Sequence, residues 1–296
     1  MNHRRNDNQG AQALCDPPAV ACAKATTPAS CLRYYGGLQS VARKIVKLLP
    51  PHDVYAEPFA GGLSVLLVKP RSDTECVSDI HPDLINYWQT VQRPSSRRRL
   101  QTLIEMTPYS RVLFNECIGL LENGGGNSLL RALAVAITHN QSRNGLGVDW
   151  SYSKRVSNMN ANSWAKLPSR IELAGRRLRH VRIECEPYQE TLQRHNDSGA
   201  VLFLDPPYMP STRVSAKVYL HEFDCKMHQR LLDTVRRLRK PKVILCGYRN
   251  KMMDDALGGW RRTDITTKSF AAPRTSGCTL GQRVLSVYTN YEPPST

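Results

Sequence analysis

Residues 201–208 of this 296-residue chain read Val-Leu-Phe-Leu-Asp-Pro-Pro-Tyr, and they form the stretch best suited to chemistry. The uninterrupted apolar run predicts a strand buried on both faces of a parallel sheet, and Pro206 and Pro207 prevent that strand from continuing. Because such sheets bind ligands at the carboxyl ends of their strands, we expect Asp205 to lie at a binding site.

The residue types at this strand end suit an amino group on a flat heterocycle. The carboxylate of Asp205 and the carbonyl of Pro206 can both accept hydrogen bonds from one exocyclic amino group, which would turn the nitrogen lone pair toward an electrophile. Pro207 adds rigidity, and Tyr208 offers a face on which a planar base can stack. The alternative is an acid that caps a turn after a buried strand, with Tyr208 in the core.

A second candidate lies in residues 54–67, which predict a short strand, a tight glycine turn and a helix. This order of elements begins a nucleotide-binding βαβ unit. The three spaced glycines of the dinucleotide pattern are missing, so a pyrophosphate is not the implied ligand. Glu57, directly before the turn, could meet a cationic amino acid moiety.

Two further signals accompany this unit. Asp79 ends a predicted strand about 20 residues beyond the glycine turn, where an acid can bind a ribose hydroxyl pair. The alternative is that Asp79 caps the helix predicted to begin near Pro82. The glycine pair Gly36 and Gly37, before a predicted helix over 41–49, would let a ligand approach backbone N–H groups closely.

The elements that must position these residues are those of an α/β protein, and the middle of the chain changes to mostly helical patterns. We expect a disordered leader over 1–32, a catalytic domain over 33–92 and 199–296, and an inserted, mostly helical region over 93–198. Residues 139–162 of this region are dense in Arg, Asn, Gln and Ser, which read base edges and phosphates, although such loops are also ordinary solvated surface. The candidate DNA contacts are Arg143, Asn144, Lys154 and Arg155.

Composition narrows the class of partner. The 41 Lys and Arg residues against 25 Asp and Glu give a formal charge of +16, which favours a polyanion and nucleic acid first. No apolar window reaches the roughly 18 residues that span a bilayer, and the N-terminus lacks the run of a secretory signal. The nine cysteines are odd in number and scattered, which argues against disulfides and a structural zinc site. We therefore expect a cytoplasmic protein without a metal or a membrane partner.

Taken in order, these motifs resemble the Dam-like DNA adenine N6-methyltransferases of the D12 class, in the alpha-type arrangement. The resemblance covers about residues 33–292 and implies a Rossmann-like methyltransferase sheet, dependent on S-adenosylmethionine, with an inserted target-recognition domain. It implies that Asp205, Pro206, Pro207 and Tyr208 bind the target adenine. The residues that it implies for the cofactor are Tyr34, Gly36, Gly37, Leu38, Glu57, Pro58, Phe59, Gly61, Asp79 and Asp205.

One departure from the family pattern concerns Leu38. Family members usually have a lysine directly after the glycine pair, close to the cofactor and the catalytic acid. The leucine raises the alternative of a weak or inactive homologue that still binds DNA.

The activity implied by the resemblance is methyl transfer from S-adenosylmethionine to N6 of adenine in double-stranded DNA, after the base has been flipped out. The alternative enzymes act on cytosine N4 or on RNA. A cognate restriction endonuclease would be the partner in a restriction-modification system.

Overall fold

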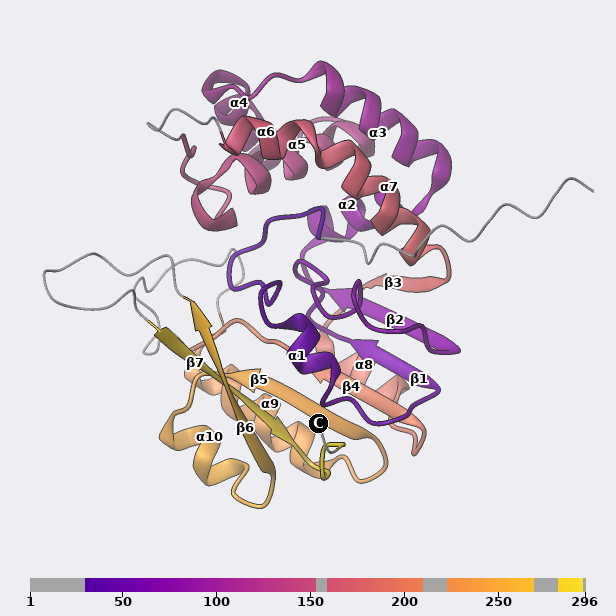
Figure 1. Ribbon diagram of the computed structural model, residues 1–296, viewed down its shortest axis with the longest axis vertical. Helices are drawn as coiled ribbons and strands as arrows, with labels where there is room; N and C mark the ends of the chain where they lie inside the picture. Colours follow the sequence, from indigo (N-terminus) through magenta and orange to yellow (C-terminus); the bar gives the residue numbers. More distant parts are fainter. Residues whose placement is uncertain (1–29, 153–158, 210–222, 269–281, 295–296) are drawn as a thin grey trace, which may run out of the picture.

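In the computed structural model, which describes residues 30–152, 159–209, 223–268 and 282–294, seven strands form one mixed sheet (Figure 1). The strand order is β3-β2-β1-β4-β5-β7-β6. The strands are β1 (Val54–Glu57), β2 (Thr74–Asp79), β3 (Val181–Cys185), β4 (Ala200–Leu204), β5 (Lys242–Gly247), β6 (Arg261–Lys268) and β7 (Gln282–Thr289).

The first five strands are parallel, as predicted for an α/β protein, and β7 runs antiparallel between β5 and β6. Apolar and polar residues alternate in the sequence from Trp260 to Thr267 and from Arg283 to Tyr288, which predicts antiparallel strands at the sheet edge. This prediction is confirmed, because β6 pairs antiparallel with β7 along its whole length. Strand β4 is buried at every residue, which explains its purely apolar sequence.

The direction of strand order changes between β1 and β4. From β1 the sheet continues to β2 and β3 on one side, and to β4 and β5 on the other. Connections then leave in opposite directions, which opens a crevice at the carboxyl ends of these two strands. Glu57 is the last residue of β1 and Asp205 directly follows β4, so both acids are delivered to the same crevice.

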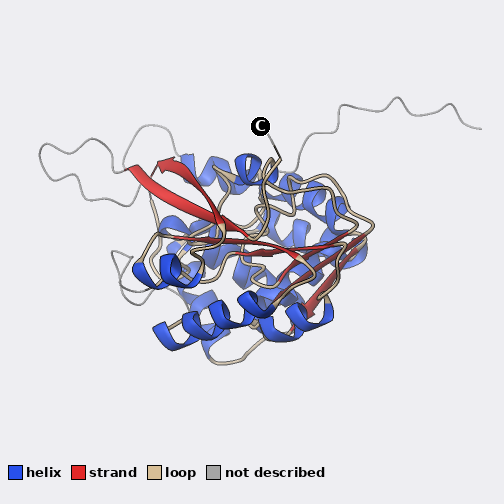
Figure 2. Ribbon diagram, turned by 90° about the horizontal axis from the view of Figure 1, so that it is seen from below, coloured by secondary structure: helices blue, strands red, loops and turns tan. Residues whose placement is uncertain are grey.

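Helices lie on both sides of the sheet, which is seen edge-on in Figure 2. Those of the middle region, α3 to α6, gather at one end of the molecule (Figure 1). The helices are α1 (Ala42–Val46), α2 (Pro82–Gln92), α3 (Pro94–Met106), α4 (Arg111–Glu122), α5 (Ser128–Gln141), the 3-10 turn η1 (Arg143–Gly145), α6 (Met159–Ala165), α7 (Leu167–Leu178), α8 (Tyr188–Arg194), α9 (Cys225–Arg237) and α10 (Lys251–Ala256).

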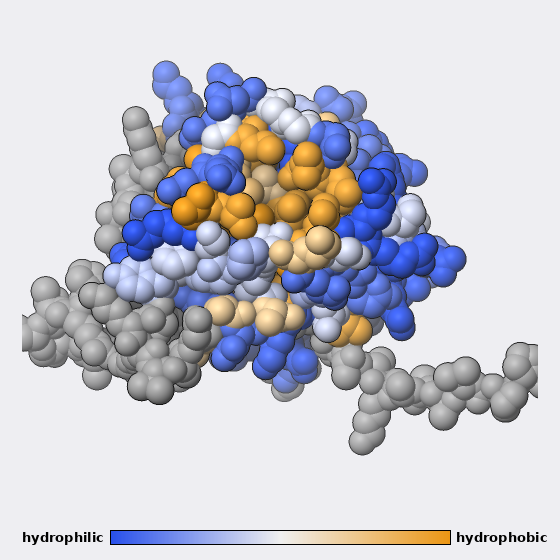
Figure 3. Space-filling view, turned by 90° about the horizontal axis from the view of Figure 1, so that it is seen from above, coloured by the Kyte–Doolittle hydropathy of each residue, from blue (hydrophilic) through white to orange (hydrophobic). Residues whose placement is uncertain are grey.

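The helical end also carries exposed apolar side chains. Seen from above, apolar residues gather there within a hydrophilic surround (Figure 3). Patches of this kind are typical of contact surfaces. The exposed large apolar residues of this region are Met106, Val112, Leu130, Val148, Tyr152 and Met159.

The boundaries of the inserted region follow from the strand pairing. The range expected for it, 93–198, also takes in β3 and α8, although β3 pairs with β2 in the main sheet. We therefore propose that the insertion ends with α7, near Leu178. At the other end of the chain, residues 1–29 lie outside the described residues, whereas Cys31 and Leu32 are fully buried.

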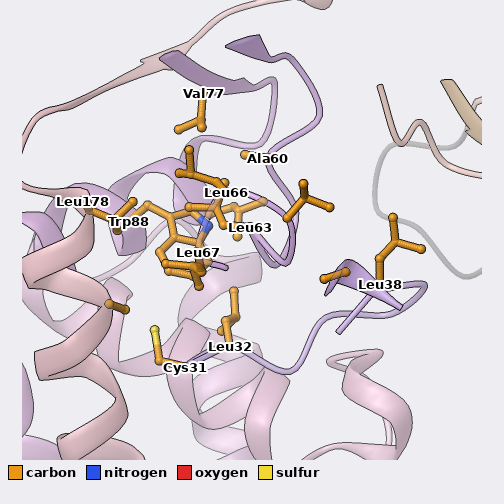
Figure 4. Close-up of a cluster of buried hydrophobic side chains, with 14 of the residues drawn as sticks. Cys31, Leu32, Leu38, Ala60, Leu63, Leu66, Leu67, Val77, Trp88 and Leu178 are labelled. Carbon is orange, nitrogen blue, oxygen red and sulfur yellow. The ribbon is translucent and has the colours of Figure 1, made fainter. Parts of the chain in front are cut away.

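The helix expected at 63–67 is replaced by turns. Leu63 has φ 50°, which a right-handed helix does not allow. The Leu67 N–H donates to the Leu63 carbonyl (3.1 Å) and the Lys69 N–H to the Val65 carbonyl (3.0 Å), but these bonds do not extend into a helix. The segment is held instead by packing, since Leu63 and Leu67 lie against Trp88 in a buried cluster (Figure 4). The Trp88 Nε1–H donates to the Gly61 carbonyl (3.0 Å) and ties the glycine turn to α2.

Candidate active site

A cavity of about 290 Å³ lies at the carboxyl ends of β1, β2 and β4. Every residue predicted for the cofactor or for the catalytic tetrapeptide lines it, although these residues come from four separate stretches of sequence. They are Tyr34, Gly36, Gly37, Leu38, Glu57, Pro58, Phe59, Gly61, Asp79, Asp205, Pro206, Pro207 and Tyr208.

Part of the lining was not predicted from the sequence. Tyr188 follows β3, a strand so short that only the alternation of Val181 and Ile183 could have indicated it. Its ring stacks on Phe59, with 5.4 Å between centroids and 27° between planes, and Phe223 meets Phe59 edge-on. These rings form an aromatic wall suited to a flat ligand group. Other unpredicted lining residues are Ile80, His81, Pro187, Gln189 and Met227.

Asp205 emerges from the buried strand β4 with its side chain half-buried. The Tyr208 hydroxyl donates to its Oδ1 at 2.8 Å, which holds the carboxylate in one orientation. Burial raises the pKa of Asp205 to about 7, against the lowering effect of the Tyr208 hydrogen bond. Tyr208 is itself buried, and it meets the Tyr248 ring edge-on at 4.7 Å while also lining the cavity.

Glu57 is almost fully buried and is the second acid of the cavity. The Tyr55 hydroxyl donates to its Oε2 at 3.0 Å. Burial raises the pKa of Glu57 to about 8; the Tyr55 hydrogen bond lowers it, and the nearby Asp205 raises it. A cationic ligand in this cavity would favour the ionised form of both acids, and the ionised acids would in turn stabilise the cation.

Asp79 joins the two loops that border the cavity. Its Oδ2 accepts from the Gly61 N–H (3.2 Å) and its Oδ1 from the His81 N–H (3.1 Å). The N-cap of α2 is His81, so Asp79 is not the cap that the alternative interpretation required. Gly61 has φ 43°, and a Cβ there would lie 3.3 Å from the Tyr34 ring, so this turn requires glycine.

The first loop brings Tyr34 and Leu38 to the cavity. Its turn is closed by the Gly37 N–H donating to the Tyr34 carbonyl (3.0 Å), so close that a Cβ on Gly37 would lie 2.9 Å from that oxygen. Leu38 is 5% exposed and packs in the core. Among the described residues that line the cavity there is no lysine or arginine, so the leucine leaves the two acids without the ammonium of a lysine beside them.

The predicted DNA contacts do not lie in the cavity. Arg143 and Asn144 are exposed in a tight loop that Ser142 and Trp150 close by an antiparallel bridge. Lys154 and Arg155 lie outside the described residues. In the sequence, Arg170, Arg176, Arg177 and Arg179 lie on one predicted helix, which could face phosphate. The side chain of Arg177 is only 9% exposed and donates to both carboxylate oxygens of Glu75, so its role is structural.

Two negative findings apply to the described part of the chain. It contains no group of three or more His, Cys, Asp or Glu side chains arranged to hold a metal ion. None of its helices is both long enough and apolar enough to cross a membrane.

Comparison with known proteins places the chain in a family. The family of D12 class N6 adenine-specific DNA methyltransferases matches residues 34–116 and 151–268, which include all four stretches that line the cavity. The chain belongs to this D12 family. The resemblance noted in the sequence is thereby confirmed at the level of the family.

The similarity to individual D12 relatives is more distant. The DNA adenine methylases of two strains of Vibrio cholerae serotype O1 are each 28% identical over 188 residues, which is 60% of this chain. The match spans 65% of the length of those relatives. The crystal structure of SMU.472 complexed with SAH is 10% identical and matches with a TM-score of 0.26, over 89% of this chain and 82% of that one. At this TM-score the match carries no weight for fold or ligand.

Proposed function

We propose that this D12 family member transfers a methyl group from S-adenosylmethionine to N6 of adenine in double-stranded DNA. The observation that carries the proposal is the convergence of Asp205, Glu57 and Asp79 on one cavity at the carboxyl ends of three parallel strands. Family membership supports the substrate and the reaction class.

The lining of the cavity fits the proposed cofactor. Glu57 suits the ammonium of its amino acid moiety, and the fixed carboxylate of Asp79 suits a ribose hydroxyl pair. Phe59 and Tyr188 offer the flat surface that an adenine ring needs. When bound, S-adenosylmethionine supplies a methyl group on a sulfonium, and that positive charge matches a lining with acids and no lysine or arginine among its described residues.

The target amino group would be held by Asp205 and by the Pro206 carbonyl. Each accepts one N–H, so that the nitrogen lone pair is directed at the methyl carbon. The N–C bond forms as the C–S bond breaks, and sulfur keeps the electron pair of the broken bond. The nitrogen then sheds one proton, which an ionised Asp205 can accept because its pKa is about 7.

Base flipping costs a few kcal/mol because the adenine leaves its stack and its pair. Contacts to phosphates would offset that cost, with Arg143 and Asn144 exposed on the helical side of the molecule and Lys154 and Arg155 as further candidates. Such contacts predict a steep loss of DNA affinity with added salt, and an affinity independent of salt would remove the argument from charge.

The test uses the Asp205→Ala variant in cells that otherwise lack adenine methylation. DNA from cells that express the unchanged protein should yield N6-methyladenine after digestion to nucleosides, and DNA from the variant should yield none. Calorimetry should show that the variant still binds S-adenosylmethionine. Full methylation by the variant would overturn the proposed role of Asp205, and N4-methylcytosine in the digest would transfer the assignment to the cytosine alternative.

A second candidate function is that of an inactive DNA-binding homologue, and Leu38 is the observation that favours it. The family lysine is missing, and no described lining residue supplies its charge. This candidate predicts DNA binding without any heat on addition of S-adenosylmethionine. RNA as substrate, a partner restriction endonuclease and a cytoplasmic location stay predictions from the sequence.

A further inference from the structure

The carboxyl end of α5 touches both the predicted DNA-contacting loop and the loop that borders the cavity. Two neighbouring side chains make these contacts. The Arg33 N–H donates to Asn140 Oδ1 (3.2 Å), and Asn140 Nδ2 donates to the Cys31 carbonyl (3.4 Å). The segment that leads into Tyr34 is therefore held by a helix of the inserted region.

His139 makes the more direct connection. Its ring stacks on Tyr34, with 5.2 Å between centroids and 19° between planes. Tyr34 also lies against the glycine turn, within 3.3 Å of the Cβ position of Gly61. Tyr34 thus contacts both His139 and the turn that borders the cavity.

The same histidine holds the exposed loop. His139 Nδ1 lies 3.0 Å from the Gly145 carbonyl, and because a carbonyl can only accept, Nδ1 carries the proton. Burial lowers the pKa of His139 to about 4, so the ring is neutral near pH 7 and keeps this tautomer. Gly145 follows Arg143 and Asn144 directly, so the hydrogen bond fixes the base of the loop that presents them.

The loop also packs directly on the backbone next to Tyr34. Gly145 has φ 75°, and a Cβ there would lie 2.6 Å from the Arg33 carbonyl oxygen. Movement of the loop would therefore be transmitted both through this backbone contact and through the imidazole ring.

We propose that His139 is a positioning residue. Through Tyr34, it couples the binding of DNA at the 142–150 loop to the affinity of the cavity for the cofactor. Its ring holds Tyr34 through stacking, and its Nδ1–H holds the loop. DNA that orders the loop would then order the wall of the cavity, and by reciprocity the cofactor would favour DNA binding. This inference rests on the proposed function.

Two substitutions separate the two contacts. His139→Phe keeps a flat ring against Tyr34 but loses the donor to Gly145, whereas His139→Gln keeps a donor but loses the ring. His195→Ala is the control, because His195 is a buried histidine at the C-cap of α8 and, like His139, does not line the cavity. Thermal unfolding verifies that each variant is folded.

The measurement is the dissociation constant of S-adenosylhomocysteine, which cannot react, with and without saturating sheared genomic DNA of mixed sequence. We expect the unchanged protein to bind it about fivefold or more tightly with DNA, within the usual range of coupling. His139→Phe should bind it normally without DNA and lose the DNA effect. His139→Gln should bind it about threefold to tenfold more weakly even without DNA, as expected for a lost ring stack. His195→Ala should match the unchanged protein.

Each contrary outcome has a separate meaning. If the unchanged protein binds neither S-adenosylmethionine nor its product, the proposed function fails and this inference with it. If it binds but DNA has no effect, or if both His139 variants retain the DNA effect, the inference alone is overturned. If His195→Ala lost the DNA effect to the same extent, general destabilisation would explain the result, and the inference would also be overturned.

Discussion

The substitution Leu38→Lys adds a positive charge directly after the glycine pair, and its effect can be worked from the two acids of the cavity. Asp205 has a pKa of about 7 and must be ionised to accept the amino hydrogens of the target. The methylation rate at low substrate concentration, kcat/KM, should therefore fall as the pH decreases through about 7 in the unchanged protein. At about pH 6 roughly one tenth of Asp205 would be ionised.

A lysine at position 38 would place an ammonium in the wall that also contains Asp205 and Glu57. An opposite charge within a few ångströms lowers a carboxyl pKa by about 1–3 units, so Asp205 would titrate near about pH 5. Roughly nine tenths would then be ionised at about pH 6, and kcat/KM relative to its plateau should rise about ninefold there. Above about pH 8 the gain should disappear, because Asp205 is ionised in both proteins.

The assay follows transfer of radiolabelled methyl groups into genomic DNA between about pH 5.5 and pH 8.5, at limiting substrate. Leu38→Met is the control, since it changes shape at this position without adding charge. The reasoning is refuted if the unchanged protein has a flat profile over this range, or if Leu38→Lys and Leu38→Met give the same midpoint. DNA affinity measured at each pH separates an effect on binding from one on the acid.

Three further predictions concern stability. Folding raises the pKa of Asp205, so ionisation of this group opposes folding increasingly as the pH rises toward about 7. Asp205→Asn removes this effect and should therefore increase the free energy of unfolding more at about pH 8 than at about pH 5. The difference between the two pH values should be roughly 2 kcal/mol, after allowance for the partial exposure of Asp205. Equal gains at both pH values in urea unfolding would contradict this. Gly61→Ala should lower the free energy of unfolding by about 1–2 kcal/mol and weaken cofactor binding, because Gly61 has φ 43° and the Tyr34 ring is close. Gly259→Ala is the control and should have neither effect, because there is open space around Gly259. Glu75→Gln should lower the free energy of unfolding by about 3–5 kcal/mol, since Glu75 is 4% exposed and pairs with the buried Lys69 and with Arg177, whose side chain is 9% exposed. Glu292→Gln breaks an exposed ion pair and should lower it by under about 1 kcal/mol. Similar losses in the last two variants would show that burial is not the cause.

Much of the site could be predicted because each acid follows its own local signal. Asp205 comes after an unbroken apolar run, Asp79 ends another strand, and Glu57 precedes a glycine turn. Parallel strands deliver their carboxyl ends to one edge, so three local signals predict one common location. The antiparallel pair β6 and β7 was predicted on the same basis, from alternation of apolar and polar residues.

Other features had no local signal. Strand β3 is five residues long with only two clearly apolar positions, so the sequence indicated neither this strand nor the contribution of Tyr188 to the cavity. The helix expected after the glycine turn did not form, because Leu63 takes a left-handed conformation that its sequence neighbours do not indicate. Arg177 looked like a phosphate contact, and only a strand about 100 residues away supplies the carboxylate that pairs with it.

The sequence by itself determined which residue types stand at the ends of the strands, because burial on both faces demands apolar runs and the prolines and glycines terminate them. The tertiary structure decided what those residues experience. Desolvation raises the pKa values of Asp205 and Glu57, and the approach of α5 sets His139 on Tyr34. Both effects depend on groups far apart in the chain, and distance through space is what a local pattern does not carry.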